Sequence, residues 1–169
     1  AAQYYLATRG DKGNWKSIED LEPSFFAFEH LIRAEDFDAA AELLNEIHYD
    51  YLDPLSYHKR AFERRQSLFG KISDRKLEGR NLGWTGIIPN PIVESQQAYT
   101  YLQKALSIST QVNDTKGVVI WNILLAENYM KQKDYNQAYE ILVEHLNSEE
   151  LTILPHWYSR LLNGLRACY

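Results

Sequence analysis

Apolar residues recur along this chain at intervals of three and four, the spacing that places side chains on one face of an α-helix. Phe25, Phe28 and Ile32 follow this rule, and the spacing returns from residue 37 to residue 49 with Glu42 and Glu46 on the opposite face. No stretch alternates apolar and polar residues for long, as a half-buried strand would. The pattern therefore predicts an all-α protein.

Capping residues and helix breakers divide this pattern into about eight helices joined by short loops. Ser24 is predicted to cap the first helix. Asp53 followed by Pro54 predicts the start of a third helix, which ends at Gly70. The other helices are predicted over residues 37–49, 74–88, 92–111, 114–130 and 135–146, and from Pro155 onward. Such a succession of short helices without strands is typical of stacked αα-hairpins.

Part of the chain repeats itself, and its clearest copy runs from Trp121 to Leu142. It resembles a tetratricopeptide repeat at Leu125, Ala126, Tyr129, Asp134, Tyr135 and Ala138. The resemblance implies one tetratricopeptide-like domain over residues 1–169, a right-handed αα-hairpin superhelix. Its clearest repeats are 74–111 and 115–147, with a weaker repeat at 24–50 and a capping helix at 155–169. Ala98 and Ala138 are predicted where paired helices cross, because small residues let helices approach closely.

A second resemblance indicates which kind of repeat protein the chain is similar to. Its motifs lie in residues 14–21, 28–34, 49–52, 105–108 and 113–117. Together they look like the repeat tail of bacterial signal-transducing NTPases of the NACHT or NB-ARC type. This implies a helical module that senses or holds a partner, while a separate module binds and hydrolyses nucleotide. The chain does not begin with methionine, its only one being Met130, so we expect it to be a piece of a longer protein.

The charges are unevenly distributed. The chain carries a net charge of −5, but residues 59–80 hold eight basic and three acidic residues, a net +5 that leaves −10 for the rest. The overall charge argues against a general nucleic-acid binder, whereas the basic segment suggests an anion-facing or partner-facing patch. A solvated helix face is the alternative. The basic patch comprises Lys59, Arg60, Arg64, Arg65 and Lys76.

The sequence shows no recognisable catalytic, cofactor or metal site. No phosphate-binding GxxxxGK[ST] loop occurs, and Gly83 is expected to serve close helix packing. The five histidines form neither an HExxH motif nor a pair four residues apart. Cys168 is the only cysteine, so neither a disulfide within the chain nor a thiolate zinc site is expected. We therefore predict a protein that is not an enzyme.

Two further absences in the sequence indicate where in the cell the protein resides. It has no run of about 20 apolar residues, which a membrane helix needs. Its first residues do not resemble a signal sequence. We expect a cytoplasmic protein without membrane contact, and a monomer or weak dimer.

The tetratricopeptide resemblance also implies where a partner binds, because in that family the first helix of each repeat lines a concave groove. Carrying over this register predicts a partner-binding groove formed by Arg80, Trp84, Ile123, Glu127 and Lys131, with Glu29 and Arg33 from the weak repeat. Trp121 and Tyr129 are expected to pack in the core. The partner is then a protein, a peptide or another domain of the parent chain. Two alternatives remain, a free-standing adaptor that docks a peptide, and a module that contacts nucleic acid or another anionic partner through residues 59–80.

Overall fold

The computed structural model describes residues 1–11, 15–48, 57–89 and 92–168. All regular elements in these ranges are helical, which confirms the all-α prediction for this part of the chain. The first half contains α1 (Ala2–Ala7), the 3-10 helix η2 (Glu19–Leu21), α2 (Glu22–Arg33), α3 (Phe37–Ile47), α4 (His58–Ser67) and α5 (Arg75–Gly86). The second half contains α6 (Ser95–Gln111), α7 (Thr115–Lys131), α8 (Tyr135–His145), the 3-10 helix η4 (Glu149–Ile153) and α9 (Pro155–Ala167).

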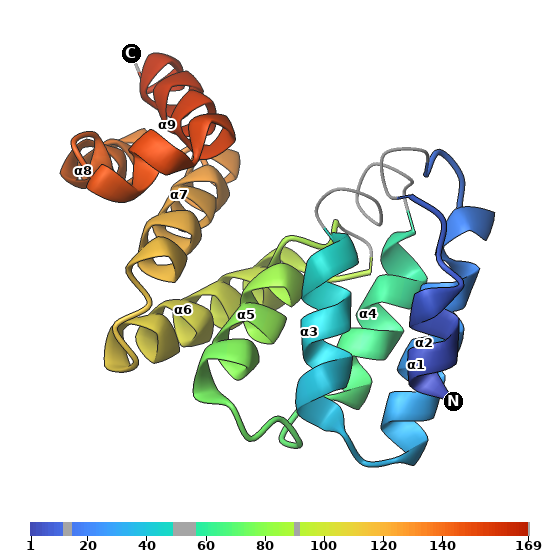
Figure 1. Cartoon of the computed structure of the whole chain (residues 1–169). Helices are drawn as coiled ribbons and strands as arrows, with labels where there is room; N and C mark the ends of the chain where they lie inside the picture. The colour runs from blue at the N-terminus through green and yellow to red at the C-terminus, as the bar shows by residue number, and fades with distance from the viewer. Residues whose placement is uncertain (12–14, 49–56, 90–91, 169) are drawn as a thin grey trace.

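The helices are stacked as an array that follows the order of the chain. Helices α1 to α4 lie at one end, α5 and α6 in the middle, and α7 to α9 at the other end (Figure 1). From α4 onward each helix packs against the next one in sequence, as α1, α2 and α3 do among themselves. In addition, α3 contacts α5, α5 contacts α7, and α7 contacts α9. One side of the array is therefore built from every second helix.

Three of the tight turns between helices share one construction. Glu35, Asn113 and Lys133 have left-handed backbones, with φ angles of 58°, 56° and 64°. Each is followed by an aspartate whose N–H donates to a carbonyl five residues earlier, at 3.0, 2.8 and 3.0 Å. This arrangement satisfies backbone groups at the end of the preceding helix and is the Schellman type of helix end. The same turn thus recurs after α2, α6 and α7.

Aspartate side chains start several of the helices that the sequence predicts. The side chains of Asp36, Asp74 and Asp134 each accept a hydrogen bond from the backbone N–H three residues later, at distances of 3.2, 2.9 and 3.2 Å. An N-cap of this kind stabilises a helix by about 1 kcal/mol. The predicted starts of α3, α5 and α8 are confirmed to within one residue.

One predicted cap is wrong. Helix α2 begins at Glu22, so Ser24 lies inside its first turn, where it is buried and its hydroxyl has no partner among the described residues. Asp114 stands at the start of α7, but its carboxylate does not cap the helix. It lies instead 3.2 Å from the Nζ of Lys76 and 3.5 Å from the Nε of Arg80. The sequence shows a polar residue at a helix start but not which neighbour competes for it.

Other boundaries differ by a few residues. The helix predicted to begin at residue 92 begins at Ser95. Helix α1 was not predicted, because it has only six residues and no side-chain cap. The predicted start at Asp53 and Pro54 lies outside the described residues, whereas α4 ends at Ser67, shortly before Gly70 with its φ of 72°.

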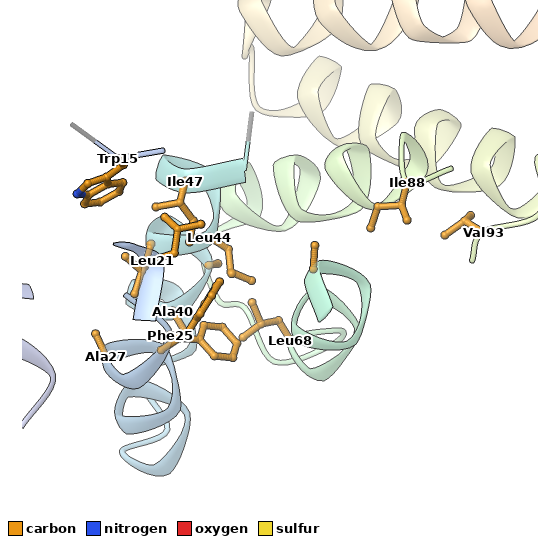
Figure 2. Close-up of a cluster of buried hydrophobic side chains, with 14 of the residues drawn as sticks. Trp15, Leu21, Phe25, Ala27, Ala40, Leu44, Ile47, Leu68, Ile88 and Val93 are labelled. Carbon is orange, nitrogen blue, oxygen red and sulfur yellow. The ribbon is translucent and has the colours of Figure 1, made fainter. Parts of the chain in front are cut away.

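The buried apolar side chains form two clusters. The first lies mainly between α2, α3 and α4, and Figure 2 shows Phe25, Ala40 and Leu44 together there with Leu68 facing them. The second joins α6, α7, α8 and α9 around Trp121 and contains Ala138, which is fully buried as predicted for a helix crossing. This second cluster forms the core beneath the site described next.

Gly83 shows why small residues are needed between these helices. A Cβ atom added to Gly83 would lie only 2.5 Å from the Trp121 ring. Because real side chains do not approach so closely, α5 and α7 can be this near only with glycine at this position. The sequence-based expectation that Gly83 serves close helix packing is confirmed.

Candidate functional site

A cleft of about 470 Å³ opens where the end of α5 and the start of α6 diverge from α7 and α9. Its apolar surface comes from side chains such as those of Ile87, which is partly exposed, and Pro89, which is exposed. Its charged surface comes from Glu127 and Lys131 on α7 and from Arg160 on α9. The full lining comprises Gly86, Ile87, Ile88, Pro89, Val93, Ser95, Ala98, Leu102, Leu124, Glu127, Asn128, Lys131 and Arg160.

An ion pair forms part of the wall of this cleft. The Nε and Nη2 atoms of Arg160 donate to the two carboxylate oxygens of Glu127 at 2.8 and 2.5 Å. Such a two-pronged pair fixes orientation as well as charge. The Cζ atom of Arg160 also lies 4.9 Å from the centre of the Trp157 ring, a cation–π contact. The pair ties α7 to α9, and Lys131 stands exposed four residues beyond Glu127.

Aromatic side chains connect the helices on the same side of the array. The Trp84 ring on α5 lies 5.2 Å from the Trp121 ring on α7, at an interplanar angle of 83°. It also lies 5.4 Å from the His48 ring after α3 and 6.2 Å from the Trp157 ring on α9. Edge-to-face contacts of this kind are favourable for aromatic rings. Trp84 therefore holds four neighbouring elements together while staying partly exposed.

The structure brings together only part of the groove predicted from the sequence. Glu127 and Lys131 line the cleft, whereas Trp84 is not among the lining residues and contacts Trp157 on α9. Ile123 is only 1 % exposed and packs in the second cluster, so its side chain is not presented to a partner. The buried Asp114 carboxylate faces Arg80, which lies outside the cleft lining.

The two groove residues taken from the weak repeat lie elsewhere. Glu29 and Arg33 belong to α2, at the other end of the array (Figure 1). A carboxylate oxygen of Glu29 lies 3.8 Å from the Nη2 atom of Arg64 on α4. These residues therefore do not share a surface with the cleft.

Arg65 does not belong to an exposed basic patch, and this prediction is wrong. Its side chain is fully buried and donates hydrogen bonds to Asn45, Asn81, His48 and the Leu44 carbonyl at 3.1 to 3.4 Å. Burial lowers the pKa of the Arg65 guanidinium to about 9. The reason is that α4 turns this face toward α3 and α5, where a long polar side chain joins three helices.

The rest of the basic patch is also divided. The Arg64 guanidinium stacks 4.4 Å above the Phe25 ring, and burial lowers its pKa. Lys76 pairs with Asp114 on the far side of α5. Only Lys59 and Arg60 remain well exposed on α4, and Arg60 also contacts Tyr57. The five predicted residues thus do not form one continuous basic surface.

Sequence reasoning missed the contribution of α9 to the cleft. Trp157 and Arg160 are three residues apart and so share a helix face. That spacing is visible in the sequence, but α9 was interpreted as a capping helix. Asn128 was also missed, although it follows Glu127 directly and lines the cleft.

The possible metal ligands and the single cysteine of the described residues complete the description of the side chains. Among the described residues, no three histidine, cysteine, aspartate or glutamate side chains are close enough to hold a metal ion. Cys168 is half-buried near the end of α9, and burial raises the pKa of its thiol. A membrane-spanning helix is also not found in this part of the chain, since none is long and apolar enough.

Comparison with known proteins gives no relative from which to transfer a function. No family model matches this chain, and neither a curated protein nor a solved structure matches it significantly. The functional interpretation therefore rests on the geometry of the chain itself.

Proposed function

We propose that this chain is a non-catalytic, tetratricopeptide-like module that binds a segment of another protein, or of its own parent chain, in the cleft. The observation that carries the proposal is the meeting of Glu127 and Lys131 with an apolar surface in one cleft. At about 470 Å³ the cleft falls in the range of small ligand pockets, about 300–1,000 Å³. A few side chains of a peptide fit such a volume.

Three features support a tetratricopeptide-like array of stacked hairpins. Helices α5, α7 and α9 contact one another in succession, as the first helices of stacked hairpins do. The same helix-ending turn recurs at Glu35, Asn113 and Lys133. Gly83 lies where α5 approaches α7, and Gly86 lies where α5 approaches α6. Repetition of this kind is typical of arrays in which each unit packs only on its neighbours.

The lining of the cleft indicates which peptide it prefers. Apolar side chains fit against Ile87 and Pro89, the lining residues whose apolar atoms are accessible. The charges of Glu127 and Arg160 already compensate each other. The exposed ammonium group of Lys131 therefore favours an acidic residue beside the apolar ones. We propose a partner segment with apolar residues next to at least one carboxylate.

A display experiment tests this function. A library of random peptides is selected against the immobilised chain, and the enriched peptides are then titrated against variants. We expect Lys131→Glu to weaken their binding about tenfold or more, because it replaces an attraction by a repulsion at the cleft. Lys116→Glu is the matched control, since Lys116 is exposed at the other end of the same helix. Failure to enrich peptides, or equal binding to both variants, would contradict the proposal.

We further propose that the module belongs to a bacterial signalling NTPase, in which it senses or holds a partner. The support is the set of sequence motifs that resemble the repeat tails of such proteins. The complete open reading frame tests the idea. A GxxxxGK[ST] phosphate-binding module before residue 1 is expected, whereas a start codon directly before residue 1 would indicate a free-standing adaptor instead.

An anionic partner bound through residues 59–80 is not favoured. Arg65 is buried, and Arg64 and Lys76 are engaged with Phe25 and Asp114. A surface for nucleic acid needs several accessible cations side by side, which these residues do not provide.

A further inference from the structure

Another cavity, of about 330 Å³, lies between α2 and α4, and none of its lining residues lines the cleft. It belongs to the end of the array that contains α1 to α4 (Figure 1). Its volume is in the range of small-ligand pockets, about 300–1,000 Å³. We call it the α2–α4 cavity. Its lining includes Glu29, Ile32, Arg60, Glu63, Arg64 and Ser67.

The guanidinium group of Arg64 has hydrogen-bond donors that the described residues leave unsatisfied. Its side chain is only 16 % exposed, and its buried Nε atom has no hydrogen-bond partner among the described residues. Its Nη2 atom lies 3.8 Å from a carboxylate oxygen of Glu29, which is beyond hydrogen-bonding distance. Since buried donors without acceptors cost stability, the Nε and Nη2 edge of Arg64 is suited to a further acceptor.

Arg160 shows how such an edge is filled in the same molecule. Its Nε and Nη2 atoms donate to the two carboxylate oxygens of Glu127, at 2.8 and 2.5 Å. Arginine frequently binds carboxylates in this two-pronged manner. Arg64 has the same pair of atoms on one edge, but the Glu29 carboxylate approaches only one of them. A ligand carboxylate fits the edge of Arg64 as the Glu127 carboxylate fits that of Arg160.

Aromatic rings hold the two arginines of the cavity in place. The Cζ atom of Arg64 lies 4.4 Å from the centre of the Phe25 ring, and that of Arg60 lies 5.1 Å from the centre of the Tyr57 ring. These two rings are stacked on each other, with centres 5.3 Å apart at an angle of 21°. Such stacking uses the face of a guanidinium group and not the N–H groups at its rim. Both cations are thus fixed before a ligand arrives, which lowers the cost of binding.

The charges that line the cavity balance one another. Arg60 and Arg64 are positive, whereas Glu29 and Glu63 are negative. A ligand with one charge would leave that charge uncompensated, but a ligand with one charge of each sign would not. The Ser67 hydroxyl donates to the Arg64 carbonyl at 2.7 Å, so its oxygen can still accept a hydrogen bond from a ligand. The lining therefore favours a small zwitterion.

We propose that the α2–α4 cavity binds a free α-amino acid with an apolar side chain. Its carboxylate accepts hydrogen bonds from Nε and Nη2 of Arg64, and the Glu29 side chain, which is 52 % exposed, moves aside to admit it. The ammonium group on the adjacent carbon then pairs with Glu29 and Glu63. The apolar side chain lies against Ile32, which is partly exposed. This ligand needs one arginine edge and not the row of accessible cations that nucleic acid requires.

Titration of the whole chain with leucine, followed by backbone amide chemical shifts, tests the inference. Two related compounds each lack one charge: isocaproate is leucine without its amino group, and leucinamide has no carboxylate. The three are compared at up to about 10 mM and at constant ionic strength. We expect leucine to shift amides of α2 and α4. Leucine should also bind about tenfold or more tightly than either compound, because each of them loses one charged contact.

Variants at Arg64 test the edge that holds the carboxylate. Arg64→Gln removes the charge and should weaken leucine binding about tenfold or more. Arg64→Lys keeps the charge without the paired donors and should also weaken it. This second variant decides the question if Arg64→Gln loses its helical circular dichroism. Arg166→Gln is the matched control, since Arg166 is exposed on α9 and should be dispensable for leucine binding.

Glu29→Gln separates the two charged contacts of the ligand. It removes both the competitor for Arg64 and one partner of the ammonium group, so the preference for leucine over isocaproate should shrink about threefold or more. Lys131→Glu should bind leucine normally, because the cleft and the cavity share no lining residue. A failure of peptide binding and a failure of this inference therefore remain distinguishable. The inference is overturned if leucine leaves α2 and α4 unshifted, if isocaproate or leucinamide binds as tightly as leucine, or if the Arg64 variants keep full affinity.

Discussion

A buried histidine and a buried arginine meet where α3, α4 and α5 join. The Nδ1 atom of His48 accepts a hydrogen bond from the Nε of Arg65 at 3.4 Å, while its Nε2 has no partner among the described residues. Burial lowers the pKa of His48 well below its usual value of 6.5, and the charges of Arg65 and His58 act in the same direction. The imidazole is therefore kept neutral in the folded protein.

Because the buried imidazole of His48 stays neutral, we expect the folded protein to lose stability in acid. Below about pH 6.5 the unfolded chain protonates His48 and the folded chain does not, so the unfolded state binds more protons and acidification favours it. The free energy of unfolding should fall between about pH 6.5 and about pH 5 by at most about 1.4 kcal/mol per pH unit for this group. Half-buried His145, whose pKa burial also lowers, adds in the same direction.

Urea unfolding at several pH values measures this effect. His48→Gln keeps a side-chain acceptor for Arg65 but cannot be protonated, so its stability should depend less on pH in this window. His156→Gln is the control, because His156 is exposed on α9. An unchanged slope in His48→Gln would show that other groups carry the acid sensitivity.

At the scale of helices and turns, the sequence predicted most of the structure because local signals decide it. Asp36, Asp74 and Asp134 mark helix starts through hydrogen bonds to residues only three positions away. Ser24 gives the same local signal but is buried inside α2, because that helix begins at Glu22, three residues earlier than predicted, with Pro23 in its first turn. The start of a helix is thus predictable from the sequence where the contacts that decide it lie within a few residues of the start.

Burial was harder to predict, because it depends on how many neighbours a helix has. Ile123 was expected in the groove, but α7 is covered on several sides and this face of it is buried. Arg65 was expected at the surface on account of its charge, but Asn45 and Asn81 from other helices provide its hydrogen bonds. Neither fact follows from periodicity within one helix. Glu127 and Lys131 line the cleft, and their role in binding a partner stays a prediction.

The turn between α7 and α8 supports a prediction about stability. Lys133 has a φ of 64°, where a residue with a Cβ atom costs about 1–2 kcal/mol, whereas glycine adopts this conformation freely. Glycine also loses about 0.5–1 kcal/mol through greater freedom in the unfolded chain. Lys133→Gly should therefore raise the free energy of unfolding by about 0.5 kcal/mol, measured by chemical denaturation.

The same substitution inside a helix provides the control. Lys104 is exposed in the middle of α6, so Lys104→Gly should lower the free energy of unfolding by about 1 kcal/mol. The opposite signs of two identical chemical changes separate the effect of the turn from a general effect of losing lysine. A destabilised Lys133→Gly would mean that the side chain itself makes a favourable contact.

At the scale of the whole molecule, the two hydrophobic clusters meet at α5 and α6. The first cluster consists mainly of residues from α2 and α3, and the second mainly of residues from α7, α8 and α9, while α5 and α6 contribute to both. Between them, Trp84 contacts His48 on one side and Trp121 on the other. Because each helix contacts only near neighbours in the chain, we expect the stability of the array to be divisible along its length.

Hydrogen exchange of a core variant in each half tests this division. Leu161 is fully buried in the second cluster, and Leu161→Ala should cost about 2–5 kcal/mol. Amide protection should then fall in α7, α8 and α9, while α2 and α3 keep theirs, because the contacts of Leu161 do not reach them. Leu44→Ala in the first cluster should produce the reverse pattern. If either variant lowers protection equally in all helices, the connection through Trp84 transmits the full destabilisation and the array unfolds as one unit.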